Sequence, residues 1–220
     1  MNINPETLVF LKELKQNNNK PWFESNKDSY LSAKINTQLW FADLLTAINE
    51  FDTLEIKDPK KCMPRIYRDL RFSKDKTPYS PRLSAMIYRS KQEQKCNFYL
   101  HIEPSNSFLG GGLYVPTSSQ LKLIRDDIDY DASDIKKVLN SAAFKNNYGE
   151  LSGDRLIKIP KGFNPNHPEA ELLKLKQYLV MHHFTDEEVC SSPFMENVIK
   201  IYKQALPLFF FFDRALSFKE

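Results

Sequence analysis

Positive charge is concentrated between Arg65 and Arg82, in the stretch RIYRDLRFSKDKTPYSPR. The stretch carries six basic residues and two acids, whereas the remaining 202 residues carry 25 bases and 26 acids. A guanidinium is a planar fork that binds carboxylate or phosphate through paired hydrogen bonds, and neighbouring arginines raise the local positive potential. The residue types therefore predict an anion-binding site built on residues 65–79.

The predicted ligand-binding residues are Arg65, Arg68, Arg71 and Lys76, with Tyr79 as a hydrogen-bond donor. Three arginines at this spacing cannot share one face of a strand, because strand side chains alternate with period two. They converge only if the chain turns near Asp69, a residue type that favours turns. We therefore include Asp69 among the catalytic candidates as an orienting group rather than a base. A solvated basic loop held by structural ion pairs is the alternative.

A second polar group follows in the stretch YLHIEP, which begins at Tyr99. In a strand, His101 and Glu103 point to the same face as Tyr99, while the residues between them point to the core. A histidine two residues from a glutamate suits an acid–base pair or two metal ligands, and a half-exposed pair without chemistry is the third interpretation. We take His101 and Glu103 as candidate acid and base.

The two groups are connected by an expected ion pair. If the basic segment packs against the face of the strand that carries Glu103, this carboxylate should lie within reach of Arg65, Arg68 or Arg71. Such a neighbour would depress the pKa of Glu103 and keep it ionised near neutral pH. His101 would then be the side chain whose ordinary pKa suits proton transfer.

No metal or cofactor is predicted. Gly110-Gly111-Gly112 lacks the lysine and hydroxyl residue of a phosphate loop and the spacing of a dinucleotide fingerprint, so we expect a bulge or a close backbone approach there. The three cysteines include no close pair. His182-His183, which we expect at the end of a helix, has no carboxylate at ligand spacing.

Helices should position these groups from both sides of the sequence. Asn4-Pro5-Glu6 combines a capping side chain with proline at the first helical position, which predicts a helix over 5–17. A second helical stretch starts at Pro21, as one long helix or two with a bend, and Asp58-Pro59 should end the helical region. Helices are also predicted at 118–129, at 133–148, from Pro168 through Leu179, and from Pro193 onward.

Short runs of aromatic and branched residues between 62 and 115 predict strands at 63–68, 83–90, 96–103 and 107–115. Helices before and after a block of strands indicate an α+β fold, with a central antiparallel sheet of about four strands covered on one face. We expect one domain over residues 1–220.

The composition and the apolar runs indicate the cellular location of the protein and its kinds of partner. A net charge of +3 is too small to indicate general nucleic-acid binding, and the longest apolar run, Ala205 to Phe212, is too short to cross a bilayer. The first ten residues pass directly into an amphipathic pattern, without the features of a secretion signal. We therefore expect a cytoplasmic protein without a membrane partner. The oligomeric state is not indicated.

The chain resembles a widespread bacterial family of unknown function whose hallmark is R-x-x-R-D-x-R-F followed by lysine and tyrosine. Here the hallmark comprises Arg65, Arg68-Asp69, Arg71-Phe72, Lys76 and Tyr79. The stretches FLKELKQNNNKPWFESNK, YLHIEP, FLGGGLY and HPEAELLKLKQYL are similar to that family too. Ser80-Pro81-Arg82 departs from its pattern, in which lysine or threonine is expected near Ser80 and no proline follows. The resemblance implies no reaction.

The sequence thus predicts a protein that binds a small anionic ligand bearing phosphate or carboxylate, and it leaves open whether the protein is an enzyme. The first alternative is a nucleic-acid-associated protein in which the same basic patch contacts backbone phosphates. The second is a structural network of ion pairs with no ligand.

Overall fold

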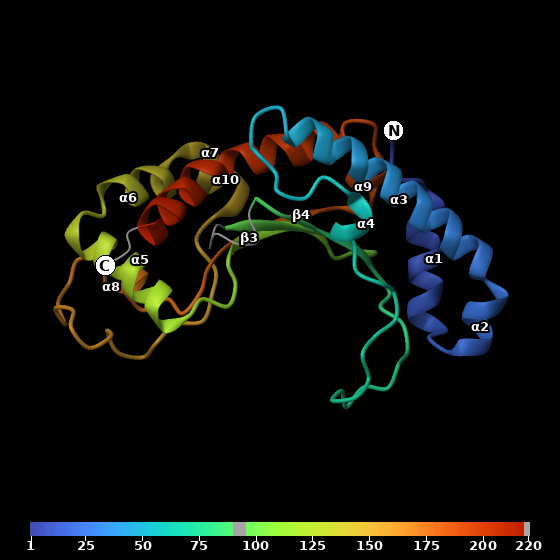
Figure 1. Cartoon of the computed structure of the whole chain (residues 1–220), viewed down its shortest axis with the longest axis horizontal. Helices are drawn as coiled ribbons and strands as arrows, with labels where there is room; N and C mark the ends of the chain where they lie inside the picture. The colour runs from blue at the N-terminus through green and yellow to red at the C-terminus, as the bar shows by residue number, and fades with distance from the viewer. Residues whose placement is uncertain (90–95, 218–220) are drawn as a thin grey trace. The chain divides into compact units, whose positions relative to one another are not determined.

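The computed structural model describes residues 1–89 and 96–217, and this part of the chain has an α+β fold, as predicted. Its elements are α1 (Pro5–Gln16), α2 (Lys20–Ser25), α3 (Lys27–Ile48), α4 (Pro59–Cys62), β1 (Leu83–Ile87), β2 (Asn97–Ile102), β3 (Ser107–Leu113), α5 (Ser118–Tyr130), α6 (Ser133–Asn140), α7 (Ala142–Tyr148), α8 (Ala170–Leu173), β4 (Tyr178–Phe184), α9 (Asp186–Cys190) and α10 (Phe194–Ser217). The strands form one antiparallel sheet in the order β1-β2-β3-β4 (Figure 1).

The chain divides into two compact units, each built from several segments. Unit 1 comprises Met1–Arg89, Tyr99–Leu109 and His183–Ile199, and unit 2 comprises Ser90–Phe98, Gly110–His182 and Lys200–Glu220. Strands β2, β3 and β4 contribute residues to both units. The expectation of a single domain stays a prediction. No helix of the described residues is both long enough and apolar enough to span a bilayer.

The N-terminal helices of unit 1 follow the sequence prediction closely. Helix α1 begins at Pro5, but the side chain of Asn4 makes no capping hydrogen bond. Instead the backbone N–H of Asn4 donates to Asn36 Oδ1 of α3 over 2.8 Å, which ties the start of α1 to the next long helix. The second stretch forms two helices, because the chain breaks at Asn26 between α2 and α3.

The segment that leads to β1 differs from the prediction. Helix α3 ends at Ile48, and Asp58-Pro59 starts the short helix α4 instead of ending a helical region, because the Asp58 side chain caps the N–H of Lys60. The strand predicted at 63–68 is absent from the sheet of the described residues. This stretch belongs to a long loop between α4 and β1 (Figure 1), in which Tyr67 pairs with Tyr79 in an isolated bridge.

The fourth strand of the sheet was predicted as helix. Residues 168–179 show leucines at helical spacing, yet only Ala170–Leu173 are helical and Tyr178–Phe184 form β4. The alternation of buried Tyr178 and Val180 fits a strand, and pairing with β3 outweighs the weak helical pattern. His182 and His183 therefore lie on a strand, which corrects the expectation that they end a helix.

Other boundaries were predicted within a few residues. The strands predicted at 83–90, 96–103 and 107–115 are β1, β2 and β3, although residue 90 lies outside the described residues. The helix predicted at 133–148 is two helices, α6 and α7, because Ser141 interrupts it and caps α7. Helices α5 and α10 match their predictions.

The two faces of β2 differ in character. Phe98, Leu100 and Ile102 are buried, with at most 2% of each residue exposed. In unit 2, Phe98 stacks on Tyr202 and Phe209 of α10 with ring centroids 3.9 and 4.3 Å apart. The alternate positions of β2 carry the polar side chains considered below, so the apolar and the polar side chains of the strand lie on opposite faces.

The glycine run of β3 permits a close backbone approach, as predicted. Gly112 has a φ of +119°, and a Cβ atom there would lie 2.1 Å from the carbonyl oxygen of Tyr178 on β4. Both the left-handed backbone and the contact with the neighbouring strand require glycine.

We expect Gly112→Ala to lower the free energy of unfolding by about 2 kcal/mol or more, because it adds backbone strain to a steric clash. Gly162→Ala is the matched control, since Gly162 also has a positive φ but no atom within 4 Å of the added Cβ. The control should cost about 1 kcal/mol. Chemical denaturation followed by circular dichroism measures both, and equal losses would contradict the role of the close approach.

Candidate functional site

The basic segment forms one wall of an open cleft within unit 1. The cleft has a volume of about 490 Å³ and is lined by Pro64, Arg65, Tyr67, Arg68, Asp69, Ser80, Pro81, Arg82 and Ser84. The lining residues come from the two arms of the loop between α4 and β1 and from the start of β1. Backbone hydrogen bonds from Arg68 N to Pro78 O and from Ser80 N to Ile66 O hold the arms together.

Two arginines of the cleft have no partner of opposite charge in the part of the chain that the structure describes. Within the described residues, neither Arg65 nor Arg82 makes a hydrogen bond or an ion pair through its guanidinium, and both side chains are exposed. The side chain of Ser84 lies beside them at the start of β1, in a residue that is 7% exposed. The cleft therefore presents two positive charges that the described protein does not neutralise.

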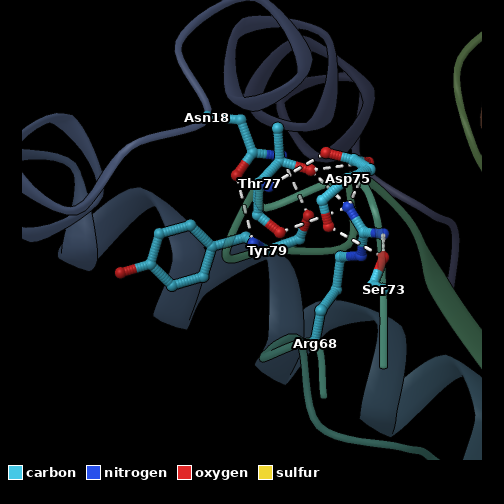
Figure 2. A network of polar contacts seen from close by, with 6 residues as sticks. All are labelled: Asn18, Arg68, Ser73, Asp75, Thr77 and Tyr79. Atoms are coloured by element: carbon cyan, nitrogen blue, oxygen red, sulfur yellow. Dashed lines mark hydrogen bonds and ion pairs between the residues drawn. The ribbon is translucent and has the colours of Figure 1, made fainter. Parts of the chain in front are cut away.

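Arg68 is used to hold the loop together. Its Nη1 atom donates to Asp75 Oδ2 over 2.5 Å and to the hydroxyl and carbonyl oxygens of Thr77, and its Nη2 atom donates to Ser73 Oγ over 3.3 Å (Figure 2). The pKa of Asp75 is lowered to about 2. The hydrogen bond from the backbone N–H of Thr77 has the largest effect and the hydrogen bond from Arg68 the second largest. The charge of Arg68 is thus largely balanced inside the loop.

Arg71 and Lys76 lie outside the cleft lining. Arg71 Nη2 pairs with Asp69 Oδ2 over 2.5 Å, and this hydrogen bond is the main reason why the pKa of Asp69 lies below its ordinary value. Lys76 Nζ donates to the carbonyl oxygen of Leu70 over 3.0 Å. Asp69 therefore orients an arginine, as its sequence position suggested, but the arginine that it orients is not in the cleft.

Tyr79 lies in an aromatic cluster away from the cleft lining. Its residue is 3% exposed, and its ring stacks on Phe23 of α2 with centroids 3.9 Å apart. Asn18 accepts a hydrogen bond from the Tyr79 N–H and donates one to the Tyr79 carbonyl, which fastens the loop to the N-terminal helices (Figure 2). Burial raises the pKa of the Tyr79 hydroxyl.

The polar face of β2 carries a continuous chain of hydrogen bonds. The Tyr99 hydroxyl lies 3.2 Å from His101 Nδ1, and His101 Nε2 lies 2.9 Å from Glu103 Oε2. The imidazole of His101 also stacks on Phe108 of β3, with ring centroids 4.7 Å apart. The structure thus brings together the predicted pair and adds Tyr99, which the sequence placed on the same face without a role.

The basic partner of Glu103 is a lysine from α1. Lys15 Nζ lies 3.0 Å from Glu103 Oε1, and Asn106 Nδ2 lies 3.3 Å from Oε2. Among the described residues, Glu103 forms no ion pair with Arg65, Arg68 or Arg71, so this expectation was wrong. The reason is that Lys15, far away in sequence, already occupies the free oxygen of the carboxylate.

Burial keeps His101 neutral. Burial is the main cause of its lowered pKa, which the hydrogen bond to Glu103 opposes and the positive charge of Arg82 reinforces. Burial by itself would raise the pKa of Glu103, but hydrogen bonds from His101, Lys15 and Asn106 leave it below the ordinary value. A neutral imidazole beside an ionised carboxylate can accept a proton near neutral pH.

Arg82 connects the two groups of polar residues. It lines the cleft, and its charge acts on His101. Arg82 belongs to the basic segment but was not predicted as a residue of the site. The sequence contained one indication of this role. Arg82 directly precedes β1, and the alternation of strand side chains places it on the same face as Ser84. Residues 1–89 and 96–217 contain no group of three or more histidine, cysteine, aspartate or glutamate residues that could hold a metal.

The chain belongs to a family of conserved hypothetical proteins, DUF2461, whose family model matches residues 6–211. This match confirms the family resemblance predicted from the sequence. No curated protein and no solved structure matches the chain.

The loop network predicts a measurable change in the titration of Asp75. Arg68→Ala should raise the pKa of Asp75 from about 2 toward 3.8 without reaching it, because the hydrogen bond from Thr77 remains. Because the pKa of Asp75 is lower in the folded protein than in the unfolded chain, its ionisation stabilises the folded loop at pH values above the unfolded pKa. This stabilisation is lost as the pH falls from about 4 toward 2. Carboxyl-carbon NMR titration measures the midpoint.

Arg71→Ala is the control for this titration. It should raise the pKa of Asp69, its own partner, and leave the Asp75 midpoint unchanged. An Asp75 midpoint that does not move in Arg68→Ala would contradict the assigned network.

Proposed function

We propose that this protein binds a small ligand bearing phosphate or carboxylate in the cleft between Arg65 and Arg82. The observation that carries the proposal is the absence of any hydrogen bond or ion pair from these two guanidinium groups to the described residues. An arginine that lies beside a cavity without an acidic partner is free to form two charge-assisted hydrogen bonds with an anion.

The size and lining of the cleft support a small ligand. A volume of about 490 Å³ falls in the range of ordinary small-molecule sites, roughly 300–1,000 Å³. Ser84 can add a hydroxyl donor, and Tyr67 presents a half-exposed aromatic ring at the same cleft. Arg68 adds positive potential, although Asp75 balances much of it.

The other predicted residues take supporting roles in this proposal. Asp69 and Arg71 form a pair that shapes the turn, and Lys76 and Tyr79 fix the loop from which Arg65 and Arg68 extend. If the protein is an enzyme, the cleft would stabilise negative charge that develops on the ligand, which is the usual contribution of such groups. His101 and Glu103 are the candidate groups for proton transfer.

One observation favours nucleic acid as the second candidate ligand. Phe72 is 95% exposed and lies in the basic segment beside Arg71. An exposed ring among basic residues can stack on an unpaired base, while the charges contact phosphates. The one-to-one pairs Arg68–Asp75 and Arg71–Asp69 limit the free charge available for such contacts.

We expect Arg65→Ala and Arg82→Ala each to weaken the binding of inorganic phosphate or pyrophosphate about 10- to 100-fold, because each removes a charge-assisted interaction of about 1.5–3 kcal/mol. Isothermal titration calorimetry measures the affinity. Lys74→Ala is the control, since it removes an exposed basic residue of the same segment that does not line the cleft and forms no ion pair with the described residues. Equal weakening in all three variants would indicate general electrostatic attraction instead of a site.

Salt dependence separates the two candidate ligands. Contact with several backbone phosphates makes log affinity fall with log salt by roughly 0.9 for each contact with duplex DNA and 0.7 for single strands. Electrophoretic mobility shifts on mixed DNA and RNA should show little binding at physiological salt. Tight, steeply salt-dependent binding that is lost in Phe72→Ala would reverse the ranking in favour of nucleic acid.

A further inference from the structure

The hydrogen-bond chain on β2 fixes the protonation of His101. Ionised Glu103 can only accept hydrogen bonds, so the 2.9 Å contact requires a proton on His101 Nε2. The lowered pKa of His101 means that the ring carries one proton, and Nδ1 therefore has a free lone pair. The Tyr99 hydroxyl, 3.2 Å away, donates to that lone pair.

This order of groups is the one that activates a hydroxyl nucleophile. A base within hydrogen-bond reach of a hydroxyl, itself oriented by a third group, is the general signature of an activated nucleophile. Glu103 would act through His101 as a positioning residue, and it would stabilise the imidazolium that forms when the proton moves. Lys15 holds Glu103 from its other oxygen.

The base, His101, is more deeply buried than Tyr99, which carries the hydroxyl. His101 is 6% exposed and is covered by Phe108, whereas Tyr99 is only half-buried. The charged or titratable groups that face this chain are Arg82 before β1, Lys15 of α1 and, behind Phe108, His183 of β4. Arg82 also lines the cleft, so one positive charge of the cleft acts on His101 of this chain.

We propose that Tyr99 is a nucleophilic hydroxyl, with His101 as its base and Glu103 as the positioning group, and that its electrophile is the phosphoryl group of an ester or anhydride held by Arg82 and Arg65. The identity of the electrophile rests on the proposed function, whereas the activation of Tyr99 does not. In the reaction, the Tyr99 oxygen forms a bond to phosphorus and the bond from phosphorus to the leaving oxygen breaks. The phenolic proton moves to His101 Nδ1 and from there to the leaving group.

A neutral aryl sulfonyl fluoride tests the nucleophile without a substrate. The phenolic oxygen bonds to sulfur, the sulfur–fluorine bond breaks, fluoride leaves and the proton passes to His101. Tyr114 and Tyr130 are internal controls, because they are 71% and 90% exposed and their hydroxyls make no hydrogen bond to the described residues. Peptide mass spectrometry of the intact chain should show Tyr99 labelled at least about tenfold faster than either. Labelling that follows exposure alone overturns the inference.

Variants of His101 and Glu103 test whether His101 acts as a base, because a purely structural role would not change how the labelling rate depends on pH. His101→Gln should slow Tyr99 labelling at pH 7 about 100-fold, in the range of general-base contributions. The wild-type rate should change little between pH 7 and 8, because His101 takes the proton, whereas the variant rate should rise about tenfold per pH unit, because hydroxide must then take it. Glu103→Gln should slow labelling by a smaller factor. A wild-type rate that rises tenfold per pH unit would mean that His101 is not the base.

Acetyl phosphate tests the electrophile. Attack by Tyr99 on phosphorus would release acetate and leave a phosphoryl group on Tyr99, detected by the same peptide analysis. Slow Tyr99 labelling by the sulfonyl fluoride in a protein that binds phosphate overturns this inference and leaves the proposed function intact. Fast labelling without phosphate binding or phosphorylation overturns the proposed function and the choice of electrophile, and leaves the activated Tyr99.

Discussion

Successive side chains of β2 must point to opposite faces of the sheet, and both the core and the candidate chemistry depend on this alternation. Phe98 and Leu100 are buried on one face, where Phe98 meets the C-terminal helix. Tyr99 and His101 are forced to the other face, where they lie close enough for a hydrogen bond. A shift of one residue in register would bury the polar set and expose the apolar one, so the core itself fixes the position of the polar chain.

Ion pairs within the basic loop decide which of its arginines remain free to bind a ligand. Asp75 and Asp69 lie within the same short segment, and each neutralises an arginine that is near it in sequence. These pairs make the loop a defined structure, because four polar groups of the loop converge on Arg68 (Figure 2). Among the arginines of the segment, the two without an acidic partner in the described residues are consequently those at its ends, Arg65 and Arg82.

Burial of His101 has a cost that its neighbours offset. A histidine with little contact with water favours the neutral form, and each of its two nitrogens then needs a partner of the right kind. Tyr99 supplies a donor and Glu103 an acceptor, so the ring is satisfied in one tautomer only. The same requirement that stabilises this part of the sheet therefore leaves a basic nitrogen beside a partly exposed hydroxyl.

The sequence by itself determined the family, the α+β class, the N-terminal and C-terminal helices and the alternation of β2, because these depend on local spacing and on residues close in sequence. It did not determine β4, because seven residues from Tyr178 to Phe184 become a strand only by pairing with a sheet formed some seventy residues earlier. It also predicted that Arg71 would bind the ligand and that Glu103 would meet an arginine. Only the tertiary structure decided that Lys15 pairs with Glu103, because residues 88 positions apart meet through distance in space, which charge counts along the chain do not contain.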